Sequence, residues 1–426
     1  MYLLGPVLIC LALGIIACLS YNHYYVTIPL YRDAYRIIYN VKDVDNINND
    51  NESNNDSSVP SFLVGWHVFL TCYLAGNVLF HYFMCVTTKS IHVNNPYHEE
   101  AVRQLAIGTN YDYPETQADK ELRQREFASR VRARRARIME EEHSFHGGSR
   151  PAVAVAAAWM YLHPTEWGWC GRTNLPKPPR SHFDYVTGGL VLNMDHYCPW
   201  MFNCVGYLNY RHFVSFLLFV VFAMIYVFSM NIGPFYKGSS EDYRIQNNSN
   251  KDNFGVDTIS YAHLIPFVPT QRDRSSIGFN VMMSSAVGIS VGMLLVFHMY
   301  LIFTAQTTIE FNSGRWRNTN VPSSSRKESQ RASPYDLGFK RNLKQVFGDC
   351  NILISIFLPS TRLPHFLPVP LEGERGHAYL DISDSDTPRR ICSSCCISSK
   401  SIKFEEEKAP TAIITGSSAE EETSLV

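Results

Sequence analysis

The chain has 426 residues, 46% of them hydrophobic, and a formal net charge of −1. This balance argues against a dedicated nucleic-acid-binding protein, which would carry a surplus of basic residues. Long apolar blocks alternate with polar stretches rich in charge, Asn or Ser, and this segregation excludes an ordinary soluble globular protein.

Four apolar blocks are long enough to cross a bilayer as helices, which takes about 20 residues. We expect them at residues 3–25, 62–86, 213–232 and 277–303. Helices are expected because only backbone that is hydrogen-bonded internally is stable in lipid. A short apolar segment at the N-terminus is also typical of a signal peptide. No basic residue precedes the first block, and this favours a retained span.

Basic residues are distributed unevenly between these blocks. Segments 27–61 and 233–276 hold three and five Lys and Arg, whereas segment 87–212 and the tail after 304 hold 15 each. Because cytosolic segments carry the excess of basic residues, we expect the last two, and both termini, on the cytosolic side. The expected fold is therefore an all-α, multi-pass integral membrane protein with four transmembrane helices and a loop-rich cytosolic domain between the second and third.

Two stretches follow the second span within the cytosolic charged region. Residues 92–113 are mixed in character and are expected to be irregular. Residues 115–142 are strongly charged and are expected to form a helix exposed to solvent. Contact of this helix with anionic lipid headgroups is the alternative, since clustered basic residues near a membrane are attracted to it.

The 11 cysteines give no sign of a disulfide framework, because none lies in a loop expected on the lumenal side. Three of them follow two arginines in a tail expected to be disordered. Cysteines beside basic residues near a membrane are typical of S-acylation sites, and the alternative is that they are reduced, exposed thiols. The candidate S-acylation sites are Cys392, Cys395 and Cys396.

The stretch just before the third span, residues 167–212, concentrates the chemistry-bearing residues. Asp195, His196 and Cys198 lie within four positions. A thiol is a good nucleophile only as the thiolate, an imidazole can take its proton, and a carboxylate can orient that imidazole. On its own such a triplet is more often structural than catalytic. Its place before a span puts the thiol near the cytosolic bilayer surface, within reach of an acyl donor whose chain lies in lipid.

The wider pattern changes that balance. It comprises Lys-Pro-Pro-Arg-Ser-His at 177–182, Asp-His-Tyr-Cys-Pro-Trp at 195–200, Asn-Cys-Val-Gly at 203–206 and Asn-Tyr-Arg-His-Phe at 209–213. In order and spacing these resemble the cysteine-rich domain of the DHHC-type protein S-acyltransferases (palmitoyltransferases). After the fourth span, Thr-Thr-Ile-Glu at 307–310 resembles the Thr-Thr-X-Glu motif of that family, and the segment 336–348 resembles its C-terminal motif.

The resemblance implies a protein-cysteine S-palmitoyltransferase that uses palmitoyl-CoA or another fatty acyl-CoA. Cys198 would carry the acyl group, His196 would act as general base, and Asp195 would orient it. The substrates would be membrane-associated proteins with cytosolic cysteines, in the endoplasmic reticulum or Golgi, with the plasma membrane as an alternative. A catalytically silent membrane scaffold of the same fold is the competing function. The supporting residues would be Pro199, Trp200, Asn203, Thr308, Glu310 and Asn342.

The sequence departs from the family at the positions that would bind zinc. Family members carry two zinc sites, but here only Cys170 and Cys204 match ligand positions, with His182 as a further candidate. Structural zinc normally needs four nitrogen or sulfur ligands, so bound zinc is doubtful. Packing of Phe183, Leu190, Tyr197 and Trp200, with hydrogen bonds from Thr and Asp, would then hold the domain. The other six ligand positions are occupied by Thr173, Phe183, Asp184, Thr187, Leu190 and Tyr197.

These expectations divide the chain into six parts. Residues 1–86 hold the first two spans and a lumenal loop, and 167–212 form the catalytic domain. The others are the cytosolic charged region 87–166, the second pair of spans 213–303, the cytosolic motifs 304–360 and the tail 361–426.

Overall fold

The fold is that of a computed structural model. Three of the sequence-based candidates, Cys392, Cys395 and Cys396, lie outside the residues that it describes. The described residues are 4–44, 61–93, 95–144, 165–249, 269, 273–313, 333–348, 352–364 and 366–367.

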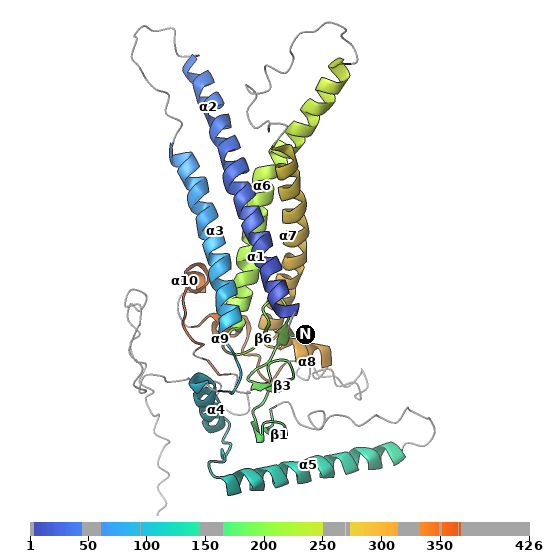
Figure 1. The fold of residues 1–426 in the computed structure, drawn as a ribbon. Helices are drawn as coiled ribbons and strands as arrows, with labels where there is room; N and C mark the ends of the chain where they lie inside the picture. The colour runs from blue at the N-terminus through green and yellow to red at the C-terminus, as the bar shows by residue number, and fades with distance from the viewer. Residues whose placement is uncertain are drawn as a thin grey trace, which may run out of the picture. The chain divides into compact units, whose positions relative to one another are not determined.

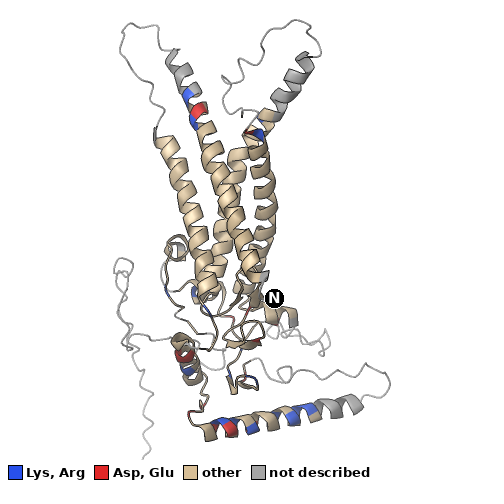
Figure 2. Ribbon diagram, viewed as in Figure 1, with Lys and Arg blue, Asp and Glu red and all other residues tan. Residues whose placement is uncertain are grey.

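Within the described residues, four stretches of helix are long and apolar enough to cross a membrane (Figure 1). This confirms the four predicted spans, and Figure 2 shows that charged side chains are absent along most of their length. The four candidate spans are Gly5–Arg36, Phe62–Thr87, Tyr210–Gly238 and Arg274–Phe303. The helices that contain them are α1 (Leu4–Asn22) with η1 (His23–Thr27) and α2 (Ile28–Val44), α3 (Ser61–Thr87), α6 (Tyr210–Ser249) and α7 (Arg274–Phe303).

The predicted end of the first span at residue 25 is wrong. The helix passes through the single π-helical turn η1 and continues as α2 to Val44. Its second half is amphipathic, with Ala34 buried and Arg32 and Asp33 exposed, so hydropathy alone reported only the apolar half. The third helix likewise extends beyond residue 232, because its polar continuation remains helical to Ser249.

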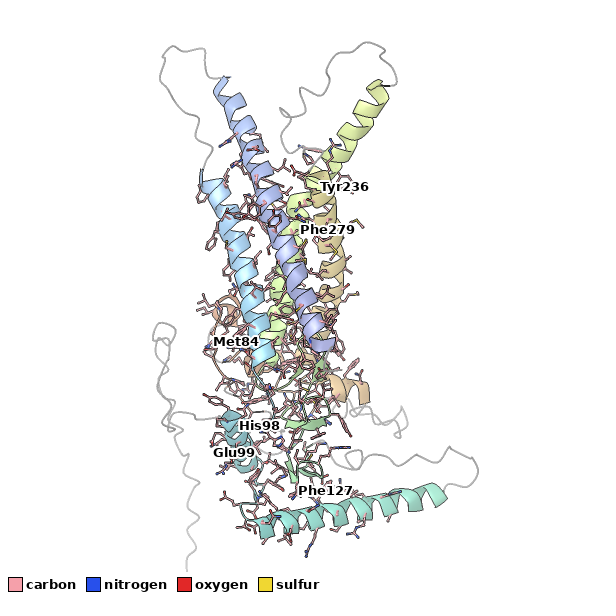
Figure 3. The ribbon with its side chains drawn as sticks, viewed as in Figure 1. Met84, His98, Glu99, Phe127, Tyr236 and Phe279 are labelled. Carbon is pink, nitrogen blue, oxygen red and sulfur yellow. The ribbon has the colours of Figure 1, made fainter. Side chains whose placement is uncertain are left out.

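Helix α6 is the centre of the bundle. It packs against α7 and α3, while α1 contacts both α3 and α7. One apolar cluster at the end of the bundle nearest the hairpins includes Tyr82, Phe213 and Leu217. A second cluster further along the helices includes Leu74 and Val220. Figure 3 shows side chains along the whole length of the bundle helices.

The segment predicted to be loop-rich forms three antiparallel hairpins, so the all-α expectation is wrong here. Their strands have three residues each, too short for an alternating pattern to reveal them in the sequence. Residues with positive φ, such as Asn174 and Gly188, lie in the connections. The pairs are β1 (Gly168–Cys170) with β2 (Leu175–Lys177), β3 (His182–Asp184) with β4 (Gly189–Val191), and β5 (His196–Cys198) with β6 (Asn203–Val205).

Two helices lie in the described part of the chain between the second span and the hairpins. The expectation that residues 92–113 are irregular is wrong, because they contain α4 (Pro96–Gly108). Asn95 caps this helix by accepting hydrogen bonds from two backbone N–H groups, and Leu105 is among the side chains that it buries. The charged helix is α5 (Gln117–Ser144), with its Lys and Arg distributed along its length (Figure 2).

Among the described residues after the fourth span, three short helices are formed: α8 (Thr308–Ser313), α9 (Phe339–Phe347) and α10 (Ile352–Phe357). Helix α10 lies against the bundle. The hydroxyl of Tyr73 in α3 donates to the carbonyl of Phe357 at 2.6 Å, and the ring of Phe357 stacks on Phe222 of α6.

Candidate active site

The hairpin of β5 and β6 presents the predicted catalytic residues together. Asp195 precedes β5, and its backbone N–H donates to the carbonyl of Val205 in β6 at 2.9 Å. Asn203 fixes the hairpin to the end of α3, because its side-chain amide donates to the carbonyls of Cys85 and Thr88 at 2.8 and 2.9 Å. The position of the predicted catalytic triplet is therefore set by the end of a candidate membrane helix.

Asp195 is buried and receives donors from two directions. His196 Nδ1 lies 2.7 Å from its Oδ2. From the other side, the backbone N–H and the hydroxyl of Thr308 each donate to the carboxylate at 2.8 Å. His298 of α7 also approaches, with Nδ1 3.9 Å from the same oxygen. A carboxylate held in this way fixes the orientation of the imidazole beside it.

The charge on His196 is stabilised by these neighbours. Burial disfavours the imidazolium, but hydrogen bonds to Asp195 and Cys198, and their charges, outweigh burial and raise the pKa of His196 to about 9. For Asp195, burial also opposes ionisation, yet the hydrogen bond and charge of His196 hold its pKa below the usual value. The pair can therefore hold the proton of a thiol as an imidazolium beside the buried carboxylate, which is the role of the base in activating a cysteine nucleophile.

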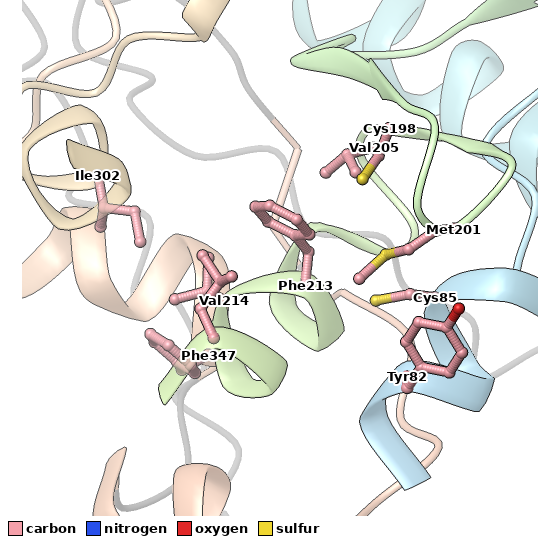
Figure 4. Packing of buried hydrophobic residues seen from close by; sticks show 10 residues of the cluster. Tyr82, Cys85, Cys198, Met201, Val205, Phe213, Val214, Ile302 and Phe347 are labelled. Carbon is pink, nitrogen blue, oxygen red and sulfur yellow. The ribbon is translucent and has the colours of Figure 1, made fainter. Parts of the chain in front are cut away.

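Cys198 lies where the hairpins meet the membrane bundle. Only 7% of its surface is exposed, and it packs with Cys85, Met201 and Phe213 (Figure 4). The hydroxyl of Tyr82 donates to the carbonyl of Trp200 in the turn that follows. The thiol therefore faces apolar side chains on one side and the imidazole of His196 on the other.

The two other predicted supporting residues of the hairpin turn, Pro199 and Trp200, are exposed. The indole of Trp200 is 51% exposed, so the expectation that it packs inside the domain is wrong. Its backbone, through the hydrogen bond from Tyr82, is the part that contributes to the site.

Glu310 supports the site through a buried ion pair. Arg180 donates to both of its carboxylate oxygens at 2.9 and 2.7 Å, and it also donates to the carbonyl of Ala305. The guanidinium lies 4.2 Å from the centre of the Tyr335 ring. Glu310 also accepts from the backbone N–H of Thr307, so the ion pair fixes the start of α8, from which Asp195 is held.

Asn342 links the C-terminal segment to the fourth span. Its amide donates to the carbonyl of Phe303 at the end of α7 and to Asp336, and its oxygen accepts from the N–H of Leu337. These contacts join α9 to the helix that leads into α8.

Sequence reasoning did not identify Arg180 and His298 as site residues. Arg180 stands within the quoted Pro-Pro-Arg string, but nothing local indicates its partner 130 positions later. His298 is an ionisable residue inside an apolar span, which is itself a signal of function. Its Nδ1 lies near the carboxylate of Asp195 and forms a hydrogen bond of 3.3 Å with the hydroxyl of Tyr210.

The residues at the zinc-ligand positions do not fit zinc. Asp184 accepts from the backbone N–H and hydroxyl of Thr187 at 2.6 and 2.7 Å, and the thiol of Cys204 lies 4.0 Å from that hydroxyl. Burial, and then the charge of Asp184, raise the pKa of the Cys204 thiol, whereas zinc binds thiolates. Tyr197 is paired across the hairpin with Cys204.

The other ligand positions lack a donor set as well. Leu190 is buried opposite Phe183 in the second hairpin, and Cys170 is buried in the first. Among the described residues, one group of three potential metal ligands has its ligand atoms close together, and it consists of Asp195, His196 and His298. The candidates Cys170, Cys204 and His182 are not part of it. A hydrogen-bonded cluster and an apolar pair thus stand where the family has zinc.

Comparison with known proteins agrees with this geometry. The family profile described as DHHC palmitoyltransferase matches residues 163–315. Palmitoyltransferase PFA3 of Debaryomyces hansenii is 25% identical over 219 residues, 49% of this chain and 48% of that protein. Palmitoyltransferase ZDHHC15 of Xenopus laevis is 31% identical over 186 residues, 42% and 43% of the two chains. The human ZDHHC15 is 27% identical over 187 residues, 42% and 44%.

The chain matches just under half the length of these relatives. The matched region includes the three hairpins, the third and fourth spans and α8. Residues 163–315 therefore carry a domain of the DHHC palmitoyltransferase family, in a chain with four candidate membrane spans among its described residues.

Proposed function

We propose that this chain is a protein-cysteine S-acyltransferase that uses palmitoyl-CoA or another fatty acyl-CoA. The observation that carries the proposal is the chain of contacts from Thr308 to Asp195, from Asp195 to His196, and from His196 to Cys198. A silent scaffold is not favoured, because it has no need of a buried carboxylate aligned with an imidazole next to a thiol.

The proposed reaction has two thioester exchanges. His196 takes the proton of Cys198, and the thiolate attacks the carbonyl carbon of the acyl-CoA thioester. The carbon–sulfur bond to CoA breaks, and the departing CoA thiolate receives the proton from His196. A substrate thiol then gives its proton to His196 and attacks the acyl group on Cys198, which leaves as thiolate. Asp195 keeps the imidazole oriented in both steps.

The environment of the thiol supports a membrane-derived acyl chain. Cys198 belongs to the apolar cluster at the end of the bundle, so a chain attached to its sulfur has apolar side chains of the four helices beside it. We infer that this end of the bundle faces the cytosol, as do both termini, because the Lys- and Arg-rich segment between the second and third spans is attached here.

Membrane-associated proteins with cysteines close to the cytosolic surface would be the acyl acceptors. The endoplasmic reticulum or Golgi is the proposed location, with the plasma membrane as the alternative. We place the catalytic domain at 167–212 and the supporting motifs at 304–360, because Thr308, Glu310 and Asn342 of the latter contact the former or the end of α7.

Autoacylation tests this function. The purified protein in detergent is mixed with a clickable palmitoyl-CoA analogue, and label is measured on wild type, Cys198→Ser and His196→Ala. Label that hydroxylamine removes, and that Cys198→Ser lacks, is the expected result. A folded, monodisperse wild type that takes up no label would instead favour the silent scaffold.

A further inference from the structure

A histidine inside the membrane bundle lacks hydrogen-bond partners. His23 is 1% exposed, and neither of its ring nitrogens has a partner among the described residues. It begins the π-helical turn η1, a local departure from the α-helix that is frequent at functional sites. Its nearest ring neighbour is Tyr226, at 5.1 Å between ring centroids.

Other polar side chains near it are paired. Thr27 in the same turn donates to the side chain of Asn231 at 2.9 Å, and the hydroxyl of Tyr226 lies 2.9 Å from a ring nitrogen of His67. A buried polar group without a partner costs about 1–3 kcal/mol, and lipid around the bundle offers none. His23 has neither ring nitrogen paired among the described residues, and its imidazole is suited to a group supplied by a ligand.

A cavity of about 80 Å³ lies against His23. Since about 15 Å³ of such space holds one water molecule, it has room for several heavy atoms. Side chains from α1, α3, α6 and α7 line it, and most are apolar, Leu19, Leu74 and Val220 among them. The cavity therefore combines apolar walls with one unpaired imidazole, which fits an apolar chain that carries a polar group at its end.

The cavity lies one acyl-chain length from the nucleophile. The apolar cluster that contains Cys198 and the cluster that lines the cavity are both packed against Phe216 and Val291, so they are continuous. Along α3, Tyr82 beside Cys198 and Thr71 beside the cavity are eleven residues apart, or about 16 Å at the rise of an α-helix. That is about half of the ~30 Å hydrocarbon core, the depth that one acyl chain covers.

The acyl chain of the proposed function lies among the four helices, and we propose that His23 binds an oxygen function carried at its far end. The substrate class would then include acyl-CoA with a hydroxyl group at the ω end. The inference rests on the proposed acyltransferase function, because it requires the acyl chain to be attached at Cys198. An apolar pocket without such an imidazole would leave the buried hydroxyl unpaired, at a cost that lowers the rate.

A competition experiment tests this. Wild type in detergent receives equal concentrations of palmitoyl-CoA and ω-hydroxypalmitoyl-CoA, and mass spectrometry measures the ratio of the two acyl groups on the peptide that contains Cys198. His23→Leu removes the imidazole and keeps an apolar side chain. Tyr24→Leu is the matched control, since Tyr24 lies in the same turn but is 46% exposed.

In wild type we expect the two donors to acylate Cys198 to a similar extent. His23→Leu should lower the ratio of hydroxyacyl to acyl about tenfold, equivalent to about 1.4 kcal/mol, while Tyr24→Leu leaves it unchanged. A preference of wild type for palmitoyl-CoA greater than tenfold overturns the proposal, even if His23→Leu does not fold. So does an equal ratio in all three proteins. If palmitoyl-CoA itself gives no label on wild type, the acyltransferase function fails, and this inference with it.

Discussion

Substituting Glu310 by Gln tests how the catalytic hairpin is supported. The Arg180 and Glu310 side chains are 5% and 4% exposed and are joined by two hydrogen bonds. In Glu310→Gln the guanidinium keeps its charge but loses the carboxylate that is paired with it. Removing one partner of a buried ion pair costs about 3–5 kcal/mol, most of it from the charge left behind.

This loss has two measurable consequences. The apparent unfolding midpoint in detergent should fall by roughly 5–15 °C, at a few degrees for each kcal/mol. The rate of acyl-enzyme formation should also fall, because Glu310 accepts from the N–H of Thr307, next to the Thr308 groups that hold Asp195. Scanning fluorimetry measures the midpoint, and a time course of label on Cys198 measures the rate.

Two further proteins sharpen the test. The double variant Arg180→Met/Glu310→Leu removes both charges and should recover more than half of the lost stability. Glu99→Gln is the matched control: Glu99 pairs with Arg103 at 3.2 Å, but the side chains are 65% and 51% exposed, so the expected change is below about 1 kcal/mol. A midpoint of Glu310→Gln within about 2 °C of wild type would refute the reasoning.

Three other predictions follow from the site. Thr308→Val removes the hydroxyl that donates to Asp195 at 2.8 Å, and we expect about tenfold slower acylation of the enzyme, measured from the same time course; an unchanged rate contradicts this. The pKa of His196 is raised to about 9 from an ordinary 6.5, so its protonation stabilises the fold fully below pH 6.5, and this stabilisation is lost as the pH rises through about 9. Between these pH values the unfolding midpoint should therefore fall more for wild type than for His196→Gln. Parallel curves for the two proteins would contradict this. Elemental mass spectrometry of the purified protein should find no stoichiometric zinc, and a chelator should leave its unfolding midpoint unchanged. One bound zinc per chain would show that the hydrogen-bonded cluster around Asp184 is not the native arrangement.

The spans were predictable because bilayer thickness sets a minimum apolar length that hydropathy detects. The same criterion missed α2, since an amphipathic helix with Arg32 and Asp33 on its exposed face has no long apolar run. It also missed α4, whose start depends on the cap at Asn95 and whose buried face is short. Helix α2 is stabilised by partial burial and α4 by local capping and partial burial, and neither produces a strong periodic pattern of apolar residues in the sequence.

The grouping of Asp195, His196 and Cys198 was predictable because they are close in sequence and stand in a specific string, and their catalytic role stays a prediction. The partners of Asp195 were only partly predictable, since they come from segments more than 100 residues away. Thr308 was found through its motif, while His298 stands in an apolar helix whose face toward the site only packing decides. Arg180 was missed because its partner, Glu310, lies 130 positions away and only the folded chain brings the two together.

The most direct test of the central claim is to locate the acyl group during a single turnover. Wild type is mixed with a limiting amount of palmitoyl-CoA and quenched in acid, the acylated cysteine is identified by mass spectrometry, and a substrate thiol is then added. The account predicts acyl on Cys198, lost to the thiol at least as fast as steady-state turnover, and absent in Cys198→Ser. Acyl found instead on a neighbour such as Cys85, with transfer intact in Cys198→Ser, would contradict it.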